Sequence, residues 1–224
     1  MSIGLLDNKK VNKICVYLQA VGERLKFSEN IIASSIIFYF RFIRDGPKNT
    51  FEDYILGTAC LMLASKAHDE DRKIRDILNC CELISKGRVI EELTEEYWKK
   101  KDKIVECEQV LLRTLAFDVE CTHSFPFMLN YAHSLHIPAE VVQVSWALLV
   151  DSYSTDIVMK YKPSLLAVSS IYIALQFVPN SIVLPRVHGG WWSIFDCKTE
   201  EVKDCSLDLL SIYETINSNN TTHS

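Results

Sequence analysis

The amino-acid sequence predicts an all-α protein made of two tandem repeats of five helices each. Only seven glycines and six prolines occur among the 224 residues, and they fall mostly between segments whose apolar residues recur at helical spacing. The second observation is an internal repeat, because residues 56–66 align without a gap with residues 166–176, which lie 110 positions later. A chain of this length suits one large domain or two domains of roughly 100 residues.

The predicted helices of the first repeat cover residues 8–24, 28–44, 51–67, 72–84 and 94–116. Those of the second repeat cover residues 124–135, 138–154, 163–177, 190–196 and 199–216. Ser28 is expected to be the N-cap of the second helix, and Thr94, which two acidic residues follow, the N-cap of the fifth. Pro138 and Pro163 suit first-turn positions, where the missing N–H costs nothing.

The third and eighth predicted helices carry the repeat. Small residues match at Gly57/Ala167, Ala59/Ser169, Cys60/Ser170 and Ala64/Ala174. Each helix is apolar on nearly all sides, which favours the centre of a helix bundle. Two buried helices can also look alike through composition alone. The two copies differ in charge, because Gln176 stands in the second where Lys66 stands in the first.

Composition and charge narrow the classes of protein. The chain is 48% hydrophobic and 24% charged with a net charge of −5, which is typical of globular proteins and favours neither nucleic-acid binding nor a membrane partner. No apolar run reaches the ~18 residues of a membrane span, and the N-terminus lacks the apolar core of a secretory signal. The eight cysteines form no C-x-x-C pair. We expect an intracellular protein, nuclear or cytoplasmic or both, with reduced and mostly buried cysteines.

Two charged residues interrupt apolar helix faces. At about 100° per residue, Lys66 falls in line with Met62 in the third predicted helix, and Glu108 lies near the line through Leu111 in the fifth. Burying one unpaired charge costs several kcal/mol, so Lys66 and Glu108 are expected to pair or to lie at the rim of a surface that a partner covers. Two alternatives remain. Lys66 can be a helix-end cation whose stem covers apolar surface, and Glu108 can reach water at the edge of its stripe.

The segment "LASK", followed by acidic residues, and the segment "ECEQVLLRTLAFDV" at 106–119 resemble the cyclin box. In cyclins a lysine closes the third helix, and a glutamate in the fifth stands nine residues before a phenylalanine. Lys66, Glu108 and Phe117 match these positions. The resemblance implies that the lysine–glutamate pair holds the segment leading into the C-helix of a cyclin-dependent kinase, and it places Ala67 and Leu112 at contact positions beside the pair.

The rest of the chain is similar to the transcription-type cyclins, and most similar to the subfamily of cyclin Q. The similarity lies in residues 145–177, in "WWSIF" at 191–195 and in "IRDILN" at 74–79. It implies a non-catalytic subunit that binds and activates a kinase as a heterodimer, and within this subfamily the kinase is cyclin-dependent kinase ten. ATP and magnesium then belong to the kinase, and the chain itself needs no cofactor, metal, nucleic acid or membrane.

The resemblance also implies a division of the chain and two departures. Residues 1–121 are expected to form the kinase-binding cyclin box, residues 122–216 the second cyclin-box repeat, and residues 217–224 a disordered tail. His68 stands where the family pattern has an acid, and the docking helix of the cell-cycle cyclins is absent. Two other functions were weighed: a cyclin-fold adaptor that binds nucleic acid or transcription proteins without activating a kinase, and a scaffold with degenerate kinase contacts.

The remaining motifs have simpler explanations. His133 and His136 lack a further ligand at a spacing that suits zinc, so we expect no metal site, and no catalytic motif occurs. Trp191 and Trp192 are expected to cap the second bundle. Residues 95–103 are expected to form a solvated helix face with Glu-to-Lys ion pairs, among them Glu96 with Lys100.

Overall fold

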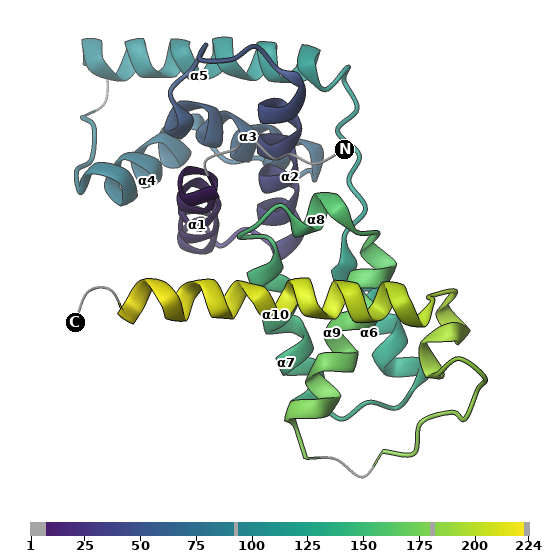
Figure 1. The fold of residues 1–224 in the computed structure, drawn as a ribbon. Helices are drawn as coiled ribbons and strands as arrows, with labels where there is room; N and C mark the ends of the chain where they lie inside the picture. The colour runs from purple at the N-terminus through teal and green to yellow at the C-terminus, as the bar shows by residue number, and fades with distance from the viewer. Residues whose placement is uncertain (1–7, 92–93, 180–181, 222–224) are drawn as a thin grey trace. The chain divides into compact units, whose positions relative to one another are not determined.

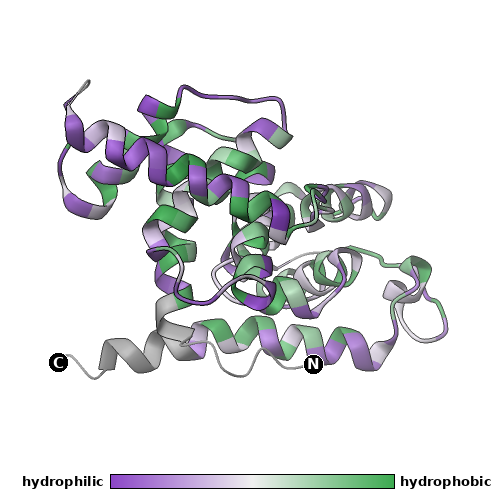
Figure 2. Ribbon diagram, turned by 90° about the horizontal axis from the view of Figure 1, so that it is seen from above, coloured by the Kyte–Doolittle hydropathy of each residue, from purple (hydrophilic) through white to green (hydrophobic). Residues whose placement is uncertain are grey.

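The structure is a computed structural model that describes residues 8–91, 94–179 and 182–221. Within these residues it contains helices and their connections and no strand, which confirms the all-α prediction. The chain divides into two compact units, Met1–Cys121 and Thr122–Ser224. Figure 2 shows hydrophobic and hydrophilic residues alternating along the helices, as expected for helices that bury one side. The helices of the described part are too short or too polar to cross a bilayer.

The first unit packs four helices around a fifth, α3 (Figure 1). Its helices are α1 (Asn8–Leu25), α2 (Glu29–Asp45), α3 (Asp53–Ala67), α4 (Ile74–Lys86) and α5 (Glu95–Thr114). Residues 56–65 of α3 are all buried, and α3 contacts α1, α2, α4 and α5. The all-round apolar sequence of this helix therefore matches its central position, and only its last turn leaves the core.

The second unit is built around α9. Its elements are α6 (Ser124–Ser134), α7 (Ala139–Ser152), α8 (Ile157–Lys160), α9 (Pro163–Phe177), the 3-10 helix η1 (Trp191–Phe195) and α10 (Thr199–Thr221). Helix α9 contacts α6, α7, α10 and η1. It begins at Pro163, 110 residues after the start of α3 at Asp53, and it ends at Phe177, 110 residues after Ala67. Helix bounds and sequence repeat thus share one offset.

Several predicted element ends differ from the structure. Thr94 caps α5 as predicted, with its hydroxyl accepting from the Tyr97 N–H, and Pro163 is in the first turn of α9. Ser28 is the N-cap of α2 but makes no side-chain cap hydrogen bond, and Pro138 is the N-cap of α7 rather than a first-turn residue. Both extended caps still release the chain into a helix, because backbone geometry and packing decide the start.

The last two elements also differ. The segment predicted as a helix at 190–196 is a five-residue 3-10 helix, fixed by burial of Trp191 rather than by helix propensity. Trp191 packs edge-on against Phe195, so this tryptophan caps the second bundle as expected. Helix α10 runs past residue 216 to Thr221, through asparagines whose low helix propensity predicted an end. The final part of the predicted tail, residues 222–224, lies outside the described residues.

All eight cysteines are free thiols, seven of them buried and Cys121 half-buried. Burial raises the pKa of the Cys15 and Cys81 thiols to about 12, which keeps the reactive thiolate scarce at neutral pH. Titration of freshly purified protein, denatured without reductant, should therefore count close to eight free thiols. Two or more missing thiols would contradict the expected reduced state.

Candidate functional site

Lys66 and Glu108 form an ion pair between the last turn of α3 and the second half of α5. The Lys66 Nζ donates to Oε1 of Glu108 at 2.8 Å and to Oε2 at 2.9 Å. The Glu108 side chain is 10% exposed and that of Lys66 is 45% exposed. The predicted pairing is confirmed, and the alternative in which Glu108 reaches water is wrong. The pair lies at a rim, with the acid buried and the base half in solvent.

The ion pair is unequal in its demand for a partner. An ammonium group has three N–H donors, and Lys66 directs two of them to Glu108, which leaves one for another acceptor. The buried Glu108 carboxylate depends on Lys66 for its charge compensation, because stranding a buried charge costs far more than losing an exposed one. Lys66 thus stabilises the fold and still presents a donor outward.

The chain leaves α3 by a tight turn that includes His68. The Asp69 backbone is left-handed, with φ of 56°, and the Glu70 N–H donates to the Ser65 carbonyl at 3.0 Å. The His68 ring lies against α2, where Nε2 is 2.8 Å from Oγ of the buried Ser34. His68 therefore ties α3 to α2, while Asp69 and Glu70 after it are exposed.

The chain leaves α5 by a similar turn that presents Phe117. Ala116 and Phe117 both have positive φ, 52° and 61°, a conformation that costs a residue with a side chain roughly 1–2 kcal/mol. The Phe117 N–H donates to the Leu112 carbonyl at 2.9 Å and the Ala116 N–H to the Arg113 carbonyl at 3.0 Å, the pattern in which glycine usually takes the left-handed position. The Phe117 side chain is nevertheless 69% exposed.

The other two predicted site residues lie on the same two helices. Ala67 is exposed at the end of α3, and Leu112 is half-buried one turn after Glu108 on α5. Since α3 and α5 pack together, their C-terminal ends carry all five predicted residues. Two of them, Ala67 and Phe117, are exposed, and Leu112 and Lys66 are partly so.

The solvated face predicted at 95–103 is wrong for Lys100. Its Nζ lies 2.6 Å from Oε2 of Glu82 on α4, and the two side chains are 16% and 10% exposed. The predicted pair with Glu96 is also present, at 3.1 Å. The signal for the buried pair was in the sequence, because Glu82 follows the buried Leu78 by one turn of α4 and so interrupts an apolar face as Glu108 does.

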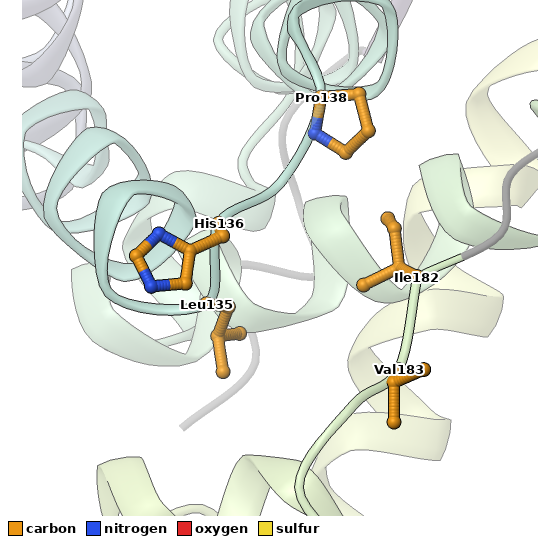
Figure 3. Close-up of a pocket in the computed structure, with 5 residues that line it drawn as sticks. All are labelled: Leu135, His136, Pro138, Ile182 and Val183. Atoms are coloured by element: carbon orange, nitrogen blue, oxygen red, sulfur yellow. The ribbon is translucent and has the colours of Figure 1, made fainter.

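The second unit offers no equivalent ion pair at the matching position, where Gln176 is exposed. It does contain an open pocket of about 420 Å³ between the α6–α7 connection and the segment after α9, lined by Leu135, His136, Pro138, Ile182 and Val183 (Figure 3). His136 is the one ring among apolar neighbours in this view. No group of three or more potential metal ligands occurs among the described residues.

Comparison with known proteins gives a family and a fold. The family model described as the cyclin N-terminal domain matches residues 5–120. Cyclin pch1 of Schizosaccharomyces pombe is 30% identical over 221 residues, which cover 95% of this chain and 64% of that protein. Human cyclin-K is 26% identical over 202 residues, 86% of this chain and 34% of that protein. The chain thus spans between one third and two thirds of these relatives.

Solved structures of low sequence identity share the fold. A chain of the yeast RNA Pol II CTD kinase CTDK-1 complex superposes with a TM-score of 0.78 at 19% identity, covering 92% of this chain and 66% of that chain. A viral cyclin from herpesvirus saimiri gives a TM-score of 0.62 at 12% identity, covering 93% and 89%. Both likenesses extend over the two helical units.

Proposed function

Because the chain belongs to the cyclin family, we propose that it is the non-catalytic subunit of a cyclin-dependent kinase and that its binding activates the kinase. Its relatives are transcription-type cyclins. The observation that carries the proposal is the ion pair of Lys66 and Glu108 at the rim where α3 and α5 end. Kinase binding is proposed for the first unit alone, since Gln176 takes the place of Lys66 in the second. The proposed location is the nucleus, the cytoplasm or both.

The ion pair can hold a peptide segment. The free N–H of Lys66 is a donor for a backbone carbonyl of the partner, and the remaining lone pairs of the Glu108 carboxylate can accept a backbone N–H. Hydrogen bonds to charged groups contribute about 1.5–3 kcal/mol each when the site excludes water. In the proposed complex this segment leads into the C-helix of the kinase.

Three apolar side chains beside the pair suit a helix of the partner. Ala67 leaves room for close approach, while Leu112 and Phe117 offer apolar surface. Covering an exposed phenylalanine contributes about 1.5–3 kcal/mol, and Phe117 has 69% of its surface to cover. The chain thus offers both the polar and the apolar contacts that fixing a helix requires.

Activation follows from where the C-helix is held. When the helix moves inward, its glutamate completes the lysine–glutamate pair around ATP, and the activation loop can take its ordered position. ATP and magnesium are bound by the kinase in this scheme. The chain supplies only the surface that favours the inward state.

For the identity of the kinase we propose cyclin-dependent kinase ten, on the resemblance of residues 145–177 and of "WWSIF" to the cyclin Q subfamily. The purified kinase should phosphorylate a peptide substrate at least tenfold faster when the chain is added. Activation of another cyclin-dependent kinase instead would overturn the identity alone. If the chain captures and activates no cyclin-dependent kinase, the adaptor function is the better account.

A further inference from the structure

The turn that presents Phe117 needs a contact from elsewhere. Two successive left-handed residues, Ala116 and Phe117, end α5, and neither is a glycine. Such backbone persists only where the surrounding structure holds it. The hydrogen bonds of this turn to the Leu112 and Arg113 carbonyls are local to α5, so they do not fix how the turn lies against the rest of the unit.

Arg41 of α2 supplies that contact. Its Nη1 donates to the backbone carbonyl of Asp118 at 3.0 Å, and its Nη2 donates to Oδ2 of Asp118 at 2.9 Å. One planar guanidinium thus binds both the main chain and the side chain of the residue that follows Phe117, which fixes direction as well as distance. The Arg41 side chain is 19% exposed and that of Asp118 is 61% exposed, so the arginine is the anchored partner.

We propose that Arg41 is a positioning residue that holds the Phe117 ring outward for the kinase, an inference that rests on the proposed function. Asp118 is the connecting residue, because gripping its carbonyl fixes the peptide unit that follows Phe117. Without the grip the two left-handed residues relax toward ordinary helical or extended backbone, and the ring then samples several directions. A partner that binds Phe117 must select one of them, which weakens binding.

A double-mutant cycle on kinase affinity tests the inference. Arg41→Ala is expected to weaken binding of purified cyclin-dependent kinase ten by about tenfold, which corresponds to about 1.4 kcal/mol. Phe117→Ala is expected to weaken it at least as much. When Phe117 is already alanine, Arg41→Ala should change the affinity less than twofold, because Arg41 acts only through that ring. Biolayer interferometry with the full chain measures all four affinities.

Two further variants separate positioning from charge and from stability. Arg41→Lys keeps the charge but cannot grip two acceptors, so it should lose most of the affinity that Arg41→Ala loses. Arg44→Ala is the matched control, since Arg44 lies on the same helix in an exposed pair with Asp45, and it should bind like the wild type. Asp118→Ala changes an exposed side chain without risk to the core and should lose affinity only while Phe117 is present.

The outcomes are distinct. Wild-type affinity for both Arg41→Ala and Asp118→Ala, while Glu108→Ala binds weakly, would overturn the positioning role and leave the proposed function intact. Additive losses in the double mutant would also overturn it, because Arg41 would then act by another route. Absence of binding to this kinase by the wild type moves the test to the cyclin-dependent kinase captured from lysate, and capture of none contradicts both proposals.

Discussion

Replacing Glu82 by alanine is expected to lower the free energy of unfolding by about 2–3 kcal/mol. The Glu82 carboxylate lies 2.6 Å from the Lys100 Nζ, and both side chains are largely buried. Lys86 and Arg88 add cations at 3.5 Å and 3.8 Å. Removing the acid leaves Lys100 poorly solvated between α4 and α5, where Glu96 remains as its partner. The remaining pair keeps the loss below that of a wholly unpaired buried charge.

The matched control is Glu95→Ala. Glu95 pairs with Lys99 at 2.6 Å, but the two side chains are 82% and 70% exposed, so the free energy of unfolding should change by no more than about 0.5 kcal/mol. Urea denaturation of the two variants and the wild type measures both changes. Equal small losses for Glu82→Ala and Glu95→Ala would show that the buried network contributes no more than a surface pair.

The architecture could be predicted because it follows from local patterns. The all-round apolar segment of α3, its copy in α9 and the constant offset of 110 residues are properties of the sequence itself. The bounds of η1 and α10 could not be predicted in the same way. Burial of Trp191 fixes the first, and neither packing of a tryptophan nor extension of a helix through asparagines is encoded in apolar spacing.

The candidate site divides along the same line. Lys66 and Glu108 could be found because each interrupts the apolar face of its own helix. The grip of Arg41 on Asp118 joins residues 77 positions apart, and neither of them interrupts an apolar stripe. The contact of His68 with Ser34 is likewise set by how α2 packs on α3. Pairings of this kind depend on helix packing, which the sequence pattern does not specify.

Removing either member of the central ion pair should weaken kinase binding by at least tenfold, about 1.4 kcal/mol. Glu108→Ala removes the acceptor and frees Lys66, whose half-exposed ammonium then returns to solvent. Lys66→Ala removes the outward donor and also strands the buried carboxylate, so it should cost stability as well, by about 1–3 kcal/mol. The double mutant should lose less affinity than the sum of the single losses, because each single change also leaves the other charge unpaired.

The matched control for this pair is built into the repeat. Gln176→Ala changes the exposed residue at the end of α9 that corresponds to Lys66, and it should bind the kinase like the wild type. Lys100→Ala is unsuitable as a control, since Lys100 belongs to the buried network with Glu82. Circular dichroism on each variant establishes that the helices remain folded at the temperature of the binding measurement.

The most direct measurement is the affinity of purified cyclin-dependent kinase for the wild type, Lys66→Ala, Glu108→Ala, the double mutant and Gln176→Ala by isothermal titration calorimetry. A cyclin that holds its kinase through the rim of α3 and α5 predicts losses of tenfold or more for both single variants, a less-than-additive double mutant and an unchanged Gln176→Ala. Near-wild-type affinity for folded Lys66→Ala and Glu108→Ala would contradict this account, and Lys66 would then be a helix-end cation that only stabilises the fold.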